Sequence, residues 1–365
     1  MENLNEQPNQ SDKYPYQMPS YGPEDDEYTY VSGFGFVPTP PDVAERQAIR
    51  SRGNALGAAF LVYFLVLSFV PNVMMVFFSM IFSDVVITGD GVFVAHPAVY
   101  ELLSMVITII AYLFPFLLIY RFSVKEKCRD AFPLRVRSRG IALLSIPICL
   151  AVTVIAMEAT QMLAALSSAI GVPMTEELSI VPPTDTAALV LFYLRMTLLP
   201  AVMEEMVFRG VIFQSLRKFS DPMALFISAG LFSLAHMSVV KIPYTFLMGL
   251  CIGYFVMKTN SLLTGMAIHL VNNTYVLTKQ LIGSNMPAEL LPIFQDISSI
   301  ALIILGFAAL LLLVNRYSGM FTLRPNSGYL RVYEQIRSFA AAPAMTITGV
   351  LLVMLTVYPY IAAIG

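Results

Sequence analysis

Two adjacent glutamates lie within an apolar run, where a charged side chain costs on the order of 3 kcal/mol. The run reads EEMVFR at 204–209. In a helix, Glu205 and Arg209 share one face at a spacing of four residues, with the acid N-terminal, which is the favourable order for an ion pair. Glu204 is rotated by about 100° from Glu205, so Arg209 cannot easily neutralise both acids. One carboxylate is therefore left for another partner or for chemistry.

Two of the three histidines also lie within apolar runs. His236 ends the sequence FSLAH at 232–236. His269 begins the sequence HLVNN at 269–273, in which Asn273 faces the same side as His269. A single histidine in a membrane helix is more often a packing residue than a functional one. Two of them, with an unpaired glutamate and an asparagine, form a polar set whose burial needs a functional reason.

These residue types can hydrolyse a peptide bond inside the bilayer. A carboxylate in an apolar site can accept a proton from water near neutral pH, and a neutral histidine can hold that water in place. A second histidine and an asparagine amide can donate hydrogen bonds to the oxyanion that forms. Alternatively, Glu204, His236 and His269 could bind Zn²⁺ and leave one position open for water. The chain has no HExxH sequence, so the spacing does not itself indicate a metal.

The composition indicates a membrane protein. Of the 365 residues, 57% are hydrophobic and 13% are charged, whereas soluble proteins have about 25% charged residues. This deficit, with a net charge of −2, argues against an ordinary cytosolic enzyme, a nucleic-acid-binding protein and a disordered regulator. The three cysteines are too few and too widely separated in sequence for a disulfide framework or a Cys-type zinc site.

From residue 53 onward, the chain divides into apolar runs that are long enough to cross about 30 Å of hydrocarbon as helices. We therefore predict an all-α fold, a polytopic membrane bundle of about eight to nine transmembrane helices. The nine predicted spans are 54–82, 98–120, 139–170, 187–213, 222–240, 242–258, 261–279, 292–315 and 345–364.

The first fifty residues differ in composition from the rest. Seven prolines and the acidic sequence EDDE at 24–27 precede the first span, among several tyrosines. Such a segment cannot bury enough apolar surface to offset its chain entropy. Residues 1–50 are therefore predicted to be a disordered, acidic, Pro- and Tyr-rich cytosolic tail, which could bind a protein partner. Residues 51–365 form the predicted transmembrane helical domain, with a catalytic motif core at 186–280.

The distribution of basic residues predicts the orientation. With a cytosolic N-terminus and nine spans, seventeen Lys and Arg residues from Arg46 onward fall in inner segments, and only Lys241 and Lys279 fall in outer ones. This asymmetry agrees with the positive-inside rule. We expect a multi-pass protein of the bacterial cell (inner or plasma) membrane, in contact with membrane lipids and with no nucleic-acid partner.

Three further charged residues fall within the spans. Glu158 and Arg195 lie at similar depth on the third and fourth spans, so we expect them to form a structural ion pair. Glu101 lies near an outer helix end, where we expect it to reach water.

The three motifs together resemble those of the CPBP family. They are EExxxR at 204–209, FxxxH at 232–236 and HxxxN at 269–273, in this order and about 32 residues apart, each within an apolar run. The family includes eukaryotic CAAX prenyl endopeptidases and bacterial relatives that are linked to bacteriocin self-immunity. The resemblance covers residues 186–280 and leaves the tail, the first spans and the last span unexplained.

The resemblance implies a role for each motif residue. Glu204 would activate the attacking water, with His236 beside it. His269 and Asn273 would stabilise the oxyanion. The implied activity is that of an intramembrane endopeptidase, acting on a membrane-associated or lipidated peptide.

Glu205 and Arg209 would orient this site, in agreement with the ion pair expected from their spacing. The resemblance implies one of two mechanisms: a glutamate mechanism, which needs no cofactor, or a zinc mechanism, in which Zn²⁺ is the cofactor. Asn273 is a poor metal ligand and a good oxyanion donor, which favours the glutamate mechanism.

Two other functions are compatible with the same residues. One is a non-catalytic membrane adaptor of the same fold, which would hold a signalling or bacteriocin-immunity partner; the acidic tail favours it. The other is a transporter with a proton relay, which the apparent lack of internal repeats disfavours. Prenylated proteins are scarce in bacteria. We therefore expect the protein to catalyse the reaction of the family, but not to act on its eukaryotic substrate.

Overall fold

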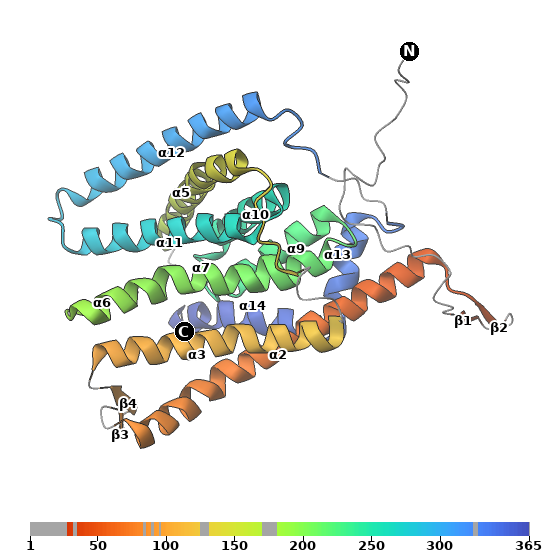
Figure 1. Ribbon diagram of the computed structural model, residues 1–365, viewed down its shortest axis with the longest axis horizontal. Helices are drawn as coiled ribbons and strands as arrows, with labels where there is room; N and C mark the ends of the chain where they lie inside the picture. Colours follow the sequence, from red (N-terminus) through yellow and green to blue (C-terminus); the bar gives the residue numbers. More distant parts are fainter. Residues whose placement is uncertain are drawn as a thin grey trace, which may run out of the picture.

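A computed structural model describes residues 28–31, 35–82, 85–88, 91–94, 96–124, 131–169, 181–323 and 328–364. Long helices packed side by side make up most of the fold, as Figure 1 shows. The strands of the described part form two short antiparallel hairpins, β1 (Tyr28–Val31) with β2 (Gly35–Pro38), and β3 (Val85–Thr88) with β4 (Gly91–Val94). The predicted all-α class is therefore confirmed.

Each predicted span corresponds to one helix or to one continuous helical segment. Seven of these, among the described residues, are long and apolar enough to cross a membrane. In chain order the helices are α2 (Pro41–Ile81), α3 (Pro97–Ile119), α5 (Arg139–Ala169), the segment α6 to α8 (Thr186–Leu216), α9 (Asp221–Leu234), α10 (Ile242–Thr259), α11 (Leu262–Ser284), α12 (Leu291–Arg316), α13 (Val332–Ala340) and α14 (Pro343–Ile364).

Helix α9 is shorter than the predicted span 222–240. It has 14 residues, or about 21 Å at 1.5 Å per residue, and it ends at Leu234 because the chain turns at Met237, which has a φ of 49°. Helix α11 has 23 residues but is not among the seven apolar spans. These two helices account for the difference between seven spans and the predicted eight to nine.

The first helix begins earlier than the boundary predicted for the tail. Helix α2 starts at Pro41, with Asp42 in its first turn. Proline fits the first helical position and an acid fits the positive end of the helix dipole, so residues 41–50 are helical. Residues 1–27 and 32–34 of the predicted disordered tail lie outside the described residues.

The buried ion pairs differ from the predicted one. Arg195 donates to the carboxylate of Glu101, not to Glu158, because α3 packs beside α6 and the adjoining turn of residues 194–198. Glu101 is buried in this contact and does not reach water. Glu158 instead accepts a hydrogen bond from Ser299 at 3.0 Å, since α5 packs along α12.

Capping residues determine where the helices that carry the motifs begin and end. Asp185 accepts a hydrogen bond from the backbone of Ala188 and begins α6, and Ser220 does the same for α9 through Met223. Asn260, in the left-handed region with a φ of 48°, ends α10, and Ser261 caps α11 directly after it. Helices α10 and α11 are thus joined by a tight turn, and α9 packs along α10.

Candidate active site

The two glutamates lie where the fourth membrane segment changes its helical winding. Glu204 is the last residue of α7 (Leu199–Glu204), and Glu205 is the first of a π-helical segment, η3 (Glu205–Ile212). π-helical turns are rare in proteins, and those that do occur are often found at functional sites. The motif EExxxR therefore spans a widened turn, which the sequence pattern did not reveal.

Glu205 is enclosed by two partners. Its Oε1 accepts from Arg209 Nη1 at 2.9 Å and lies 3.0 Å from His269 Nδ1 on α11. Both side chains of the Glu205–Arg209 pair are fully buried. Arg209 Nη2 also donates to the backbone carbonyl of Gly249 on α10 at 3.2 Å, so the pair holds three helical segments together. The predicted ion pair is therefore present.

Glu204 lies on the other side of His269 and lacks a guanidinium partner in the described residues. Its Oε2 is 3.8 Å from His269 Nε2, and its side chain is 14% exposed, against 0% for Glu205. This oxygen is buried and makes no hydrogen bond to any residue that the structure describes. The helical rotation between the two acids thus separates a carboxylate that pairs with Arg209 from one that has no guanidinium partner among the described residues, as the sequence pattern predicts.

Glycine at position 265 permits the close approach of α11 to Glu205. A Cβ atom there would lie 2.7 Å from Glu205 Oε2 and 2.7 Å from a methyl group of Val256. The contact between His269 and Glu205, one helical turn further along α11, depends on this approach. Gly265 therefore contributes to the site although it carries no chemistry, and the motif pattern does not include it.

His236 lies in the turn after α9 and not within a membrane-spanning helix. Its Nδ1 is 2.8 Å from the carbonyl oxygen of Phe232, which fixes the orientation of the ring. The side chain is half-buried, and the negative charge of Glu204 acts on it electrostatically. Because α9 ends at Leu234, the expectation that a span of 222–240 contains His236 is wrong.

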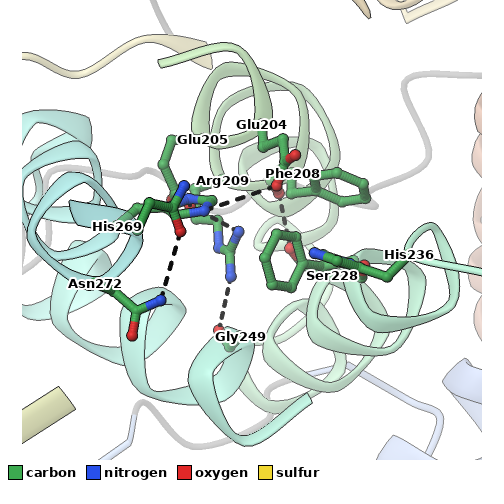
Figure 2. A network of polar contacts seen from close by, with 11 residues as sticks. Glu204, Glu205, Phe208, Arg209, Ser228, His236, Gly249, His269 and Asn272 are labelled. Carbon is green, nitrogen blue, oxygen red and sulfur yellow. Dashed lines mark hydrogen bonds and ion pairs between the residues drawn. The ribbon is translucent and has the colours of Figure 1, made fainter. Parts of the chain in front are cut away.

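The three motifs meet at the ring of Phe232, which contacts Arg209, His236 and His269; these three side chains are labelled in Figure 2. Arg209 Cζ lies 4.3 Å from the centroid of this ring. The ring of His236 lies 4.9 Å away and that of His269 5.8 Å away, both edge-on. Phe208 packs against a further edge at 5.2 Å. Phe232 appears in the sequence only as the first letter of FxxxH, and its central position was not predicted.

The asparagines follow His269 along α11. Asn273 is half-buried and accepts from Asn272 Nδ2 at 3.5 Å. Asn272 is the more buried of the two. Figure 2 shows its side chain on the same side of the site as His269. Sequence reasoning selected Asn273 from the spacing and passed over Asn272; the only signal for it is the pair of adjacent asparagines.

The arrangement does not fit a metal centre with three protein ligands. Among the residues that the structure describes, no three His, Cys, Asp or Glu side chains are grouped as a metal ion requires. The three residues proposed as zinc ligands, Glu204, His236 and His269, are therefore not gathered into such a set. Nδ1 of each histidine faces a protein oxygen, so Nε2 is the nitrogen of each ring that remains for a ligand.

Comparison with known proteins gives one match. Residues 186–275 match a family model described as "Type II CAAX prenyl endopeptidase Rce1-like". This range includes all three motifs. No curated protein and no solved structure matches the chain. With seven helices able to cross a membrane in the part that the structure describes, the chain is a multi-pass membrane protein, and its residues 186–275 are similar to the Rce1-like type II CAAX prenyl endopeptidases, in agreement with the resemblance of the three motifs.

Proposed function

We propose that the protein is an intramembrane endopeptidase in which Glu204 activates the attacking water. The observation that carries the proposal is the unequal environment of two adjacent carboxylates. Glu205 is neutralised by Arg209 and bonded to His269, whereas Glu204 Oε2 has no such partner among the described residues. Two acids whose surroundings differ in this way are typical of a division between a structural and a catalytic role.

In the proposed reaction, Glu204 removes a proton from water, and the water oxygen forms a bond to the carbonyl carbon of the peptide. The carbonyl oxygen becomes an oxyanion. His236, next to Phe232, holds the water. The proton on Glu204 then passes to the leaving nitrogen, the carbon–nitrogen bond breaks, and the products are a free carboxylate and an amine.

His269 and Asn273 are the proposed oxyanion donors. His269 Nδ1 lies 3.0 Å from Glu205 Oε1, which fixes the ring, whereas Nε2 lies 3.8 Å from Glu204 Oε2, beyond hydrogen-bond distance, and is the nitrogen proposed to face the oxyanion. Glu205 and Arg209 are positioning residues in this scheme, because they hold His269 through the contact at 3.0 Å.

The proposed mechanism uses no metal. It is supported by the donor set, in which Asn273 is a poor metal ligand, and by the described residues, among which no three His, Cys, Asp or Glu side chains are grouped to hold a metal ion. We further propose that the protein lies in a bacterial cell membrane with a cytosolic N-terminus, and that its substrate is a membrane-associated or lipidated peptide. The basic residues before α9, at 46–52, 121–139 and 217–218, support the orientation by the positive-inside rule.

The test is cleavage of a peptide library by the full-length protein in detergent, with and without a strong chelator. Glu204→Gln is expected to lower kcat/KM by about 10² to 10⁴, the range for loss of a general base. Glu158→Gln is the matched control, because Glu158 lies outside the site and is 47% exposed. We expect wild-type cleavage to survive the chelator.

Two other outcomes would contradict the proposal. Cleavage that the chelator abolishes and Zn²⁺ restores would indicate a metalloenzyme. No cleavage of any peptide by a stably folded wild type would instead favour the non-catalytic adaptor, with the N-terminal tail as the first place to look for its partner.

A further inference from the structure

Two cysteines that are remote in sequence lie side by side behind the site. Cys149 on α5 and Cys251 on α10 are 102 positions apart, and their Sγ atoms are 2.9 Å apart. The sequence separates the cysteines too widely to suggest any pairing. The structure brings them together because α5 and α10 pack along each other.

The two thiols differ in accessibility. Cys149 is 1% exposed, whereas Cys251 is only partly buried. Their surroundings are apolar, with Ile148, Met248 and Ile252 in the same cluster. The proposed peptidase mechanism uses neither thiol, so the core does not need sulfur at these positions for hydrolysis.

The pair is connected to the Glu205–Arg209 pair through α10. Cys251 lies two residues after Gly249, whose carbonyl oxygen accepts from Arg209 at 3.2 Å. Cys149 is also near enough to Arg209 and Glu205 for their charges to act on it. A covalent bond at the cysteines would therefore fix the part of α10 that holds Arg209.

We propose that Cys149 and Cys251 are an oxidisable dithiol that forms a reversible disulfide between α5 and α10. A disulfide bond is about 2.05 Å long, so the two sulfur atoms need to approach by only about 0.9 Å.

The oxidant in this proposal is a small peroxide. The more accessible thiol, Cys251, attacks hydrogen peroxide, which breaks the oxygen–oxygen bond and gives a sulfenic acid and one water. The sulfur of Cys149 then attacks the sulfenic sulfur, forms the sulfur–sulfur bond and releases a second water. Two thiols and one peroxide thus give one disulfide and two waters. An external dithiol reverses the reaction by exchange.

The test uses the full-length protein in detergent, treated with hydrogen peroxide, denatured in SDS and then alkylated. We expect the number of alkylated cysteines per chain to fall from three to one, and to return to three after dithiothreitol. Digestion without reductant should give one cross-linked peptide pair that contains Cys149 and Cys251. Cys128 should stay alkylated and serves as the internal control.

Two variants keep the test decisive. Cys251→Ala and Cys149→Ala should each abolish the cross-linked pair, and Cys251→Ala is the safer variant because its position is partly exposed. Three alkylated cysteines after peroxide treatment of folded wild type, or a cross-link to Cys128, would overturn the proposal.

Thermal unfolding gives a second readout that does not depend on peptidase activity. The disulfide would close a long loop, so oxidised wild type should unfold several degrees higher than reduced wild type. Cys251→Ala should show no such difference. Because neither readout measures cleavage, the failure of this proposal and the failure of the proposed function can be told apart.

Discussion

The guanidinium of Arg209 lies over the ring of Phe232, with Cζ 4.3 Å from the ring centroid. Arg209 belongs to the first motif and Phe232 to the second, so this contact joins two motifs that are separated in sequence. A cation over an aromatic ring in a desolvated site contributes about 2 kcal/mol. The same ring contacts both histidines of the site, which makes Phe232 the common support of all three motifs.

We expect Phe232→Leu to destabilise the protein by about 2 kcal/mol and to lower cleavage, because the cation–π contact and the edge-on support of both histidines are lost. Thermal unfolding and cleavage rate measure the two effects. Phe226→Leu is the matched control, since Phe226 is on the same helix and 50% exposed. Equal effects of the two substitutions would show that Phe232 has no special role.

The two adjacent glutamates should respond differently to the same change. Glu205→Gln leaves the fully buried Arg209 without its counter-charge, and loss of one partner of a buried pair costs about 3 to 5 kcal/mol. Glu204→Gln removes no ion pair to a guanidinium, so its unfolding temperature should stay near that of wild type while its cleavage is lost. Unfolding temperatures measured side by side decide the matter; a larger drop for Glu204→Gln contradicts the assignment.

Gly265→Ala should impair the site through packing alone. The added Cβ would lie 2.7 Å from Glu205 Oε2, and overpacking of this kind costs about 1 to 3 kcal/mol. We expect lower cleavage and a lower unfolding temperature. Gly230→Ala on α9 is the control, because a Cβ there meets nothing within 4 Å, and alanine is favoured over glycine in a helix by up to about 1 kcal/mol. Normal cleavage by Gly265→Ala would contradict the close approach of α11.

Arg195→Met tests the ion pair that the structure revises. Its partner Glu101 is buried, so the substitution should destabilise the protein by about 3 kcal/mol, the lower part of the range for an unpaired buried charge. Glu158→Gln should have little effect, because Glu158 is 47% exposed. If Glu158→Gln proved the more damaging of the two in thermal unfolding, Arg195 would have to pair with Glu158 as the sequence first suggested.

The positions of the helices could be predicted because apolar runs of sufficient length have few alternatives in a bilayer. The Glu205–Arg209 pair and the unpaired Glu204 could be predicted because helical spacing alone determines which side chains share a face. These features depend on residues that are near one another in the chain.

The remaining features depend on contacts between distant segments. The π-helical winding that begins at Glu205, the ring of Phe232 at the centre of the site and the Glu101–Arg195 pair follow from tertiary packing that hydropathy does not encode. The end of α9 at Leu234 was missed because the residues up to Val240 are apolar apart from His236 and Ser238. Spacing likewise selected Asn273 and gave no reason to consider the more buried Asn272.

The short length of α9 has a consequence for the supply of water. A helix of 14 residues extends for only about two thirds of the hydrocarbon thickness. The backbone that follows it leaves regular helix, and in a membrane such backbone is tolerated only where protein or water satisfies its carbonyls. His236 is part of that turn. Hydrolysis consumes one water in each turnover, and we expect that water to enter where α9 is interrupted, beside the half-buried residue proposed to hold it.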